Sequence, residues 1–174
     1  MNICLTRIAI LITSLLSSAQ ILTVGNAGHP RVSRLSPAQT AALVPALQDA
    51  TGDHTTNILR SFAVYEAPLS DTEPQAIIAI SVGVGCGVNP NCEFLVFRQQ
   101  GKKDVLILNA VAGDWDFKNT RHHGYRDLVL TNYQGVHTVV SVWRYDGHRY
   151  CMSSQMDRAT DGSQTRLPVS RCGS

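Results

Sequence analysis

The chain has 174 residues, of which 44% are hydrophobic and 16% charged, and its formal net charge is +2. This length fits one domain with a sizeable core. The near-neutral charge excludes a protein that attracts nucleic acid or anionic membranes through its overall charge. The sequence contains no phosphate-binding glycine loop, no G-x-S-x-G motif and no closely spaced metal-ligand set. We therefore expect no cofactor.

An export leader is predicted at residues 1–27. One basic residue, Arg7, precedes the apolar run of residues 8–16, and small residues follow it. We expect cleavage after Ala27, with Ala19 as the alternative. Polar residues interrupt the apolar segment, which favours a cleaved leader over a membrane anchor. The mature chain is then periplasmic or secreted, has no stable membrane span and keeps 14 basic and 13 acidic residues.

Four cysteines remain after removal of the leader, an even number that predicts two disulfides in an oxidising compartment. Three connectivities are open. We expect local pairing, Cys86 with Cys92 and Cys151 with Cys172, because the GVNPN segment inside the first pair is turn-forming. The alternative for the first pair is a metal site, but its five intervening residues fit the spacing of structural zinc ligands poorly. No metal site is predicted.

A helix is predicted from Pro37 toward Gly52. Ser36 is a suitable N-cap, and Gln39 completes a capping box with it. Pro45 lies inside the segment and should kink the helix or split it into two short turns. The helix should pack on a sheet, because three apolar residues fall on one face. They are Leu43, Val44 and Leu47.

After the helix the hydrophobic period changes to two, which predicts β-strands. Six segments carry this pattern, at residues 58–66, 75–82, 92–98, 104–111, 125–131 and 136–145. The second arm of a hairpin after residue 147 gives a seventh. We predict a linker at 28–35 and one α+β domain at 36–174, with the N-terminal helix packed on an antiparallel sheet or small barrel of six to seven strands. A polar tail should begin at Ser153.

The strongest turn signal is Asp146-Gly147, between two alternating segments. Asp-Gly is a preferred pair for a two-residue type I′ hairpin turn, since both central residues need positive φ. Pairing outward from such a turn places Trp143 opposite Tyr150, a favourable aromatic cross-strand pair.

The segment RHHGYRDLVL, residues 121–130, gathers residue types that occur in metal and acid-base sites. Adjacent histidines on a strand point to opposite faces, so His122 and His123 do not bind one ion from regular β structure. A turn at Gly124 that leads into a strand is therefore the prediction. The alternative is a histidine metal site completed from later strands, with Asp127 orienting one ring.

Asp114 and Asp116 flank Trp115 in the segment GDWDFK. On a strand these two carboxylates would share a face, which raises the alternative of a small periplasmic hydrolase that uses them with a histidine. No second sequence feature supplies a cleft. We therefore expect an exposed loop here and assign no catalytic residue.

Three motifs make the chain similar to a group of small exported bacterial proteins. They are CG-x4-C-x-F-L-V-F at 86–97, GYRDLVL at 124–130 and W-x-Y-D-G-x-x-Y at 143–150. All three are structural in character, so the resemblance carries over no activity, cofactor or functional residue.

The sequence thus favours an exported, non-enzymatic protein that binds an envelope or secreted protein partner, of the inhibitor or immunity-factor type. A disulfide-closed loop is rigid and loses little entropy on binding. The alternative is a stapled hairpin that only protects a sheet edge. The expected binding residues are those of the loop and two aromatic residues: Gly87, Val88, Asn89, Pro90, Asn91, Trp143 and Tyr150.

Overall fold

The computed structural model describes residues 33–83, 86 and 90–169. Within them, helix α1 (Pro37–Thr51) and the 3-10 turn η1 (Ile58–Ser61) precede nine strands. Sheet A contains β1 (Phe62–Ala67), β2 (Ala76–Ser81), β3 (Cys92–Gln100) and β4 (Lys103–Ala112), in that order. Sheet B contains β5 (Asp114–His122), β6 (Tyr125–Gln134), β7 (His137–Tyr145), β8 (Tyr150–Ala159) and β9 (Gln164–Leu167). The predicted leader lies outside these residues.

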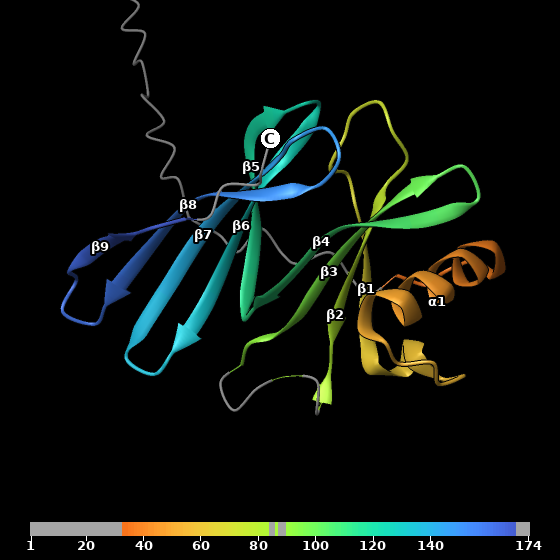
Figure 1. Cartoon of the computed structure of the whole chain (residues 1–174), viewed down its shortest axis with the longest axis horizontal. Coiled ribbons are helices and arrows are strands. Elements are labelled where there is room, and N and C mark those ends of the chain that lie inside the picture. Colours follow the sequence, from red (N-terminus) through yellow and green to blue (C-terminus); the bar gives the residue numbers. More distant parts are fainter. Residues whose placement is uncertain (1–32, 84–85, 87–89, 170–174) are drawn as a thin grey trace, which may run out of the picture.

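The elements form three layers, with α1 on one face of sheet A and sheet B on the other (Figure 1). One core lies between α1 and sheet A, and a larger core lies between the two sheets. All neighbouring strands within each sheet are antiparallel. The predicted α+β fold, with a helix packed on an antiparallel sheet, is therefore confirmed, although the strands are divided between two sheets.

Sheet A is buried on both faces, which explains the continuous apolar runs in its central strands. On β2, Ile77 packs in the helix-side core and Ile78 in the intersheet core. On β3, Leu95 and Val96 divide in the same way, and both side chains have no exposed surface. Alternation along a strand places successive side chains on opposite faces, so both faces must be apolar here.

Helix α1 follows its local sequence signals. The Ser36 side chain accepts from the Gln39 amide, the Gln39 side chain accepts from the Ser36 amide, and Gly52 ends the helix with φ 73°. Leu43 and Leu47 have no exposed surface. Pro45 lies inside the helix without splitting it, so the predicted split is wrong.

Three sequence predictions about strands are wrong. Residues 58–61 form η1 instead of the start of a strand. The GDWDFK segment, expected as a loop, belongs to β5, and the expected polar tail contains the second half of β8 and all of β9. The last of these segments, β9, exposes much of its surface, so its apolar content is low, and pairing with β8 decides its structure.

The β7–β8 hairpin differs from the predicted two-residue turn. Tyr145 lies opposite Tyr150, and Trp143 lies opposite Met152. The turn therefore has four residues, in which Asp146 Oδ1 accepts from the amides of His148 and Arg149 at 2.8 Å each. An aspartate that caps its own turn in this way favours the longer loop. The predicted Trp143–Tyr150 pair is wrong, but the two-residue shift keeps every side chain on its expected face.

Candidate functional site

The turns of the chain gather at two opposite ends of the strands (Figure 1). The β1–β2, β3–β4, β5–β6 and β7–β8 connections lie at one end, which we call the loop end. The Cys86–Cys92 disulfide lies at the other, together with Gly113 between β4 and β5; we call it the disulfide end. Contacts between the sheets confirm this arrangement, since Ser70 bridges Tyr125 at the loop end and Asn91 contacts Tyr133 at the disulfide end.

The RHHGYRDLVL segment forms the β5–β6 hairpin at the loop end. His122 lies opposite Tyr125, and the two residues between them, His123 and Gly124, have φ 48° and 82°. Two successive positive φ angles are those of a type I′ turn. The prediction of a turn that leads into a strand is confirmed.

Asp127 is the centre of a polar network beside this hairpin, although only 1% of its surface is exposed. Its carboxylate accepts from Thr120 Oγ1 at 2.7 Å and lies 2.6 Å from His122 Nδ1. Arg144 Nε lies 3.7 Å away. The aspartate therefore fixes the orientation of the His122 ring. In the described part of the chain, no group of three His, Cys, Asp or Glu side chains has the spacing of a metal site.

Three tyrosines close the intersheet core at the loop end. The rings of Tyr125 and Tyr145 are stacked with centroids 4.2 Å apart, and the Tyr150 centroid lies 5.6 Å from that of Tyr145. Arg98 Nη1 donates to Tyr145 Oη at 2.7 Å, and the Tyr125 hydroxyl donates to the Glu73 carboxylate. This cluster joins sheet A to sheet B through side chains from five segments.

Folding favours the protonated form of the tyrosine hydroxyls in this cluster. Burial raises the pKa of Tyr150 and Tyr145, and burial together with the Glu73 hydrogen bond raises the pKa of Tyr125. Sequence reasoning missed Glu73 and Arg98. The one signal that could have indicated the cluster is the recurrence of Tyr beside Arg and Asp in GYRD and RYDG.

The loop end of sheet B carries an excess of positive charge. Residues 118–149 contain five Lys or Arg and two acidic residues, whereas residues 33–117 contain five basic and nine acidic residues. Of the two acids, Asp127 is buried, and Asp146 is bonded to turn amides. The Arg149 and His148 amides lower the pKa of Asp146.

Several of the cations at this end reach solvent. The Arg144 side chain is 53% exposed. Lys118 and Arg149 are exposed, and no described carboxylate lies within ion-pair distance of either. The loop end therefore presents a positive surface on two rigid hairpins.

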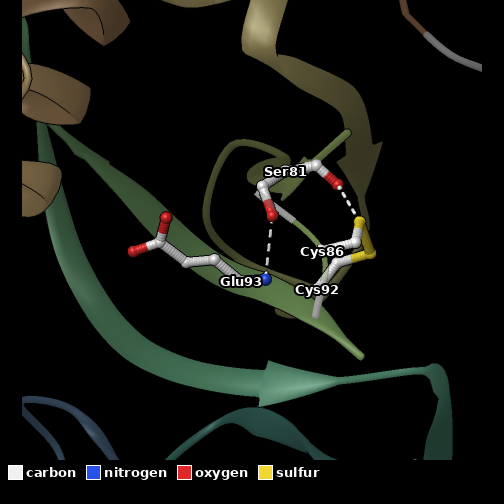
Figure 2. Close-up of a disulfide and its surroundings, with 4 residues drawn as sticks. All are labelled: Ser81, Cys86, Cys92 and Glu93. Atoms are coloured by element: carbon white, nitrogen blue, oxygen red, sulfur yellow. Dashed lines mark hydrogen bonds between the residues drawn. A yellow bond between two sulfur atoms is a disulfide. The ribbon is translucent and has the colours of Figure 1, made fainter. Parts of the chain in front are cut away.

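The disulfide end is held by the Cys86–Cys92 bond, which Figure 2 shows together with its surroundings. Ser81 Oγ accepts from the Glu93 amide at 2.9 Å, and Cys86 Sγ lies 3.2 Å from the Ser81 carbonyl oxygen. Burial raises the pKa of Glu93. The predicted Cys86–Cys92 disulfide is confirmed. One disulfide, not two, is seen in the described residues, since Cys172 lies outside them and its pairing with Cys151 stays a prediction.

Asn91 joins the two sheets next to this disulfide. Its Nδ2 donates to the Tyr133 carbonyl at 2.7 Å, and its Oδ1 accepts from the Tyr133 amide at 2.8 Å. The side-chain amide thus pairs with β6 as a neighbouring strand would. Gly113 leaves room for this contact, because a Cβ at that position would lie 2.5 Å from the Tyr133 ring.

The structure does not bring the predicted binding residues together. Pro90 is exposed, Asn91 is bonded to β6, and Gly87, Val88 and Asn89 lie outside the described residues.

Tyr150 is 3% exposed and donates to the Arg126 carbonyl at 2.7 Å, while Trp143 packs against the intersheet core. Arg126 and Tyr133 lie at opposite ends of β6, about 23 Å apart at the usual rise per residue. The two aromatic residues and the described loop residues Pro90 and Asn91 therefore do not form one surface.

Asp114 and Asp116 do not converge with a histidine. Each accepts from the amide of the following residue, at 2.8 Å and 2.7 Å. His122 is on the same strand but beyond an irregularity in the β5–β6 register, where it contacts Asp127. A cavity of about 420 Å³ lies elsewhere, near the start of α1. It is lined by Ser33, Arg34, Leu35, Thr40, Leu59, Phe62 and Val64.

The described part of the chain contains no helix that is both long and apolar enough to cross a membrane. Comparison of the chain with protein-family models, with curated proteins and with solved structures finds no match.

Proposed function

We propose that this chain is an exported, non-enzymatic binding protein that recognises an acidic protein partner through the loop end of sheet B. The observation that carries the proposal is the separation of charge. Arg144, Arg149 and Lys118 are displayed on two hairpins, while the acids beside them are buried or bonded within the fold. A fixed positive surface accelerates association with an acidic partner and disfavours basic ones.

Export is part of the proposal. The Cys86–Cys92 bond is stable in an oxidising compartment, and residues 1–27 have the composition of a leader. The inhibitor and immunity-factor classes fit this proposal, because proteins of both classes bind a partner protein through a preformed rigid surface.

The hydrolase alternative has weaker support. Catalysis requires the acid, the base and a substrate cavity to converge. Asp114 and Asp116 bond to their own strand, and His122 bonds to Asp127. None of these residues lines the cavity near α1.

Deleting the disulfide loop would not test whether this loop binds the partner. Removing residues 87–91 would also remove Asn91 and both of its bonds to Tyr133, so lost binding would not be distinguished from damage to the fold. Point substitutions on exposed residues avoid this difficulty.

The experiment compares two double charge reversals of equal size. The first is Lys118→Glu with Arg149→Glu at the loop end of sheet B, two exposed residues that have no carboxylate partner in the described part of the chain. The second is Lys102→Glu with Lys103→Glu, at the exposed β3–β4 turn of sheet A. The immobilised protein is used to capture partners from envelope extract and culture fluid, and the captured protein is then purified for affinity measurements.

We expect the reversal on sheet B to weaken binding at least tenfold, about 1.4 kcal/mol, mainly through slower association. The control reversal should change it by less than about twofold, and added salt should weaken the wild-type complex. Equal effects of the two reversals, or binding that salt does not change, would contradict the proposal.

A further inference from the structure

The cavity near the start of α1 has an apolar floor. It lies at β1, an edge strand of sheet A, and its volume of about 420 Å³ is within the range of small-molecule sites. Four apolar side chains line it and also contact the core between α1 and sheet A: Leu35, Leu59, Phe62 and Val64. The first three are only half-buried, so they leave apolar surface open to the cavity. An alkyl chain placed there would extend this core.

Hydrogen bonds fix the walls of the cavity. The Ser33 amide donates to the Val64 carbonyl at 2.8 Å, and Ser33 Oγ accepts from the Glu66 amide at 3.1 Å. Gln39 Nε2 donates to the Glu66 carboxylate at 2.5 Å. These bonds tie the chain before α1, and the first turn of α1, to β1. The cavity is therefore formed before a ligand enters, and binding does not have to order its walls.

The charge at the cavity is positive. Arg34 is the only charged residue among the described residues that line it, and its side chain is exposed. No carboxylate of residues 33–83 or 90–169 lies within ion-pair distance of Arg34. The Glu66 carboxylate does not line the cavity and is bonded to Gln39. The first turn of α1 contains no acidic residue, so the positive end of the helix dipole is not neutralised there.

We propose that this cavity binds a free carboxylate with a single alkyl chain, that is, a fatty acid of medium chain length. The chain would lie against Leu59, Phe62 and Val64, and the head group would pair with the Arg34 guanidinium, which matches the geometry of a carboxylate. The volume is near the lower end of the range for small-molecule sites, which favours one chain over the two of a phospholipid. The site is separate from the loop end and does not depend on the partner proposed for it.

Isothermal titration calorimetry of the purified, oxidised protein with decanoate, below the concentration at which decanoate forms micelles, tests the proposal. We expect saturable binding of one decanoate per chain. Each methylene buried in the cavity should tighten binding about fourfold, so octanoate should bind more than tenfold more weakly than decanoate.

Ligands with the same chain test the head group. Decanol has no charge and decyltrimethylammonium has the opposite charge, and both should bind at least tenfold more weakly than decanoate. Vesicles of dioleoylphosphatidylglycerol carry an anionic head group on two chains. The protein should not sediment with them.

Substitutions at the cavity separate the roles of charge and volume. Arg34→Ala should weaken decanoate binding at least tenfold and decanol binding by less than about twofold. The matched control is Arg60→Ala, at an exposed arginine that follows Leu59 but does not line the cavity, and it should change the decanoate Kd by less than about twofold. Thr40→Phe places a ring in the cavity and should weaken both ligands at least tenfold. If Thr40→Phe does not fold, Arg34→Ala carries the test.

Three results would overturn the proposal: no saturable binding of decanoate, equal binding of decanoate and decyltrimethylammonium, or equal effects of Arg34→Ala and Arg60→Ala. Binding to the vesicles but not to decanoate would overturn it as well. The first result would assign the cavity to the chain that precedes Ser33. The double reversal Lys118→Glu with Arg149→Glu should leave the decanoate Kd unchanged, so failure of this proposal is distinguishable from failure of the proposed function.

Discussion

The two sheets share an antiparallel meander but differ in what covers them. Sheet A lies between α1 and sheet B, and its strands β2 and β3 are apolar on both faces (Figure 1). Sheet B packs through one face, and its strand β7 alternates buried Val139 and Ser141 with half-buried Val140 and Val142. The difference indicates that sheet A supplies most of the stability, whereas sheet B has a face and an end available for recognition.

Charge follows the same division. Residues 33–112, which hold α1 and sheet A, have seven acidic and five basic residues. The two hairpins at the loop end of sheet B have the opposite balance. The near-neutral net charge of the chain is therefore the sum of an acidic region and a basic region. The net charge alone does not describe the surface that a partner meets.

Truncation of the two sheets should separate them most clearly. Leu95→Ala removes a fully buried side chain from the core under α1 and should lower the free energy of unfolding by about 3 kcal/mol. Val140→Ala on the outer face of sheet B should lower it by less than about 1 kcal/mol. Urea denaturation measures both free energies. Similar losses at the two positions would contradict the difference in coverage.

The link between the sheets provides the next largest effect. Asn91→Ala removes two hydrogen bonds to the Tyr133 backbone and should lower the free energy of unfolding by about 2 kcal/mol. The neighbouring exposed Pro90 is the control, and Pro90→Ala should stay within about 0.5 kcal/mol of wild type. If Asn91→Ala has no more effect than the control, its contact with β6 does not hold the sheets together.

The tyrosine cluster makes the loop end sensitive to alkali. Folding raises the pKa of Tyr125, Tyr145 and Tyr150, so the folded chain holds these protons more tightly than the unfolded chain. Their contribution is complete below the unfolded pKa of about 10 and is lost as the pH rises above it. The melting temperature should therefore fall above about pH 10, and Tyr125→Phe should make the fall less steep. An unchanged slope would contradict the burial of Tyr125.

Local signals account for what the sequence predicted. The capping box and Gly52 define α1 within a few residues of sequence, and continuous apolar runs identify β2 and β3. The turn at His123 and Gly124 is local as well. Asp127 and His122 are only five residues apart, so the contact between them could be predicted from the sequence. Asp127 was expected to orient a histidine ring only in the alternative of a metal site.

The remaining features depend on contacts that are distant in sequence. β9 has little apolar content and exists because it pairs with β8. The tyrosine cluster joins Glu73, Arg98 and Tyr145, which no short motif contains. The separation of charge likewise becomes visible only when strands are assigned to sheets.

The most direct test of the division between the sheets is the solvent exposure of valine methyl groups, measured by NMR with a soluble paramagnetic agent in dilute protein. The agent should broaden the methyl signals of Val140 and Val142 and leave those of Val96, which has no exposed surface, unchanged. If Val140 is shielded as completely as Val96 in the dilute protein, the outer face of sheet B is covered and the account is contradicted.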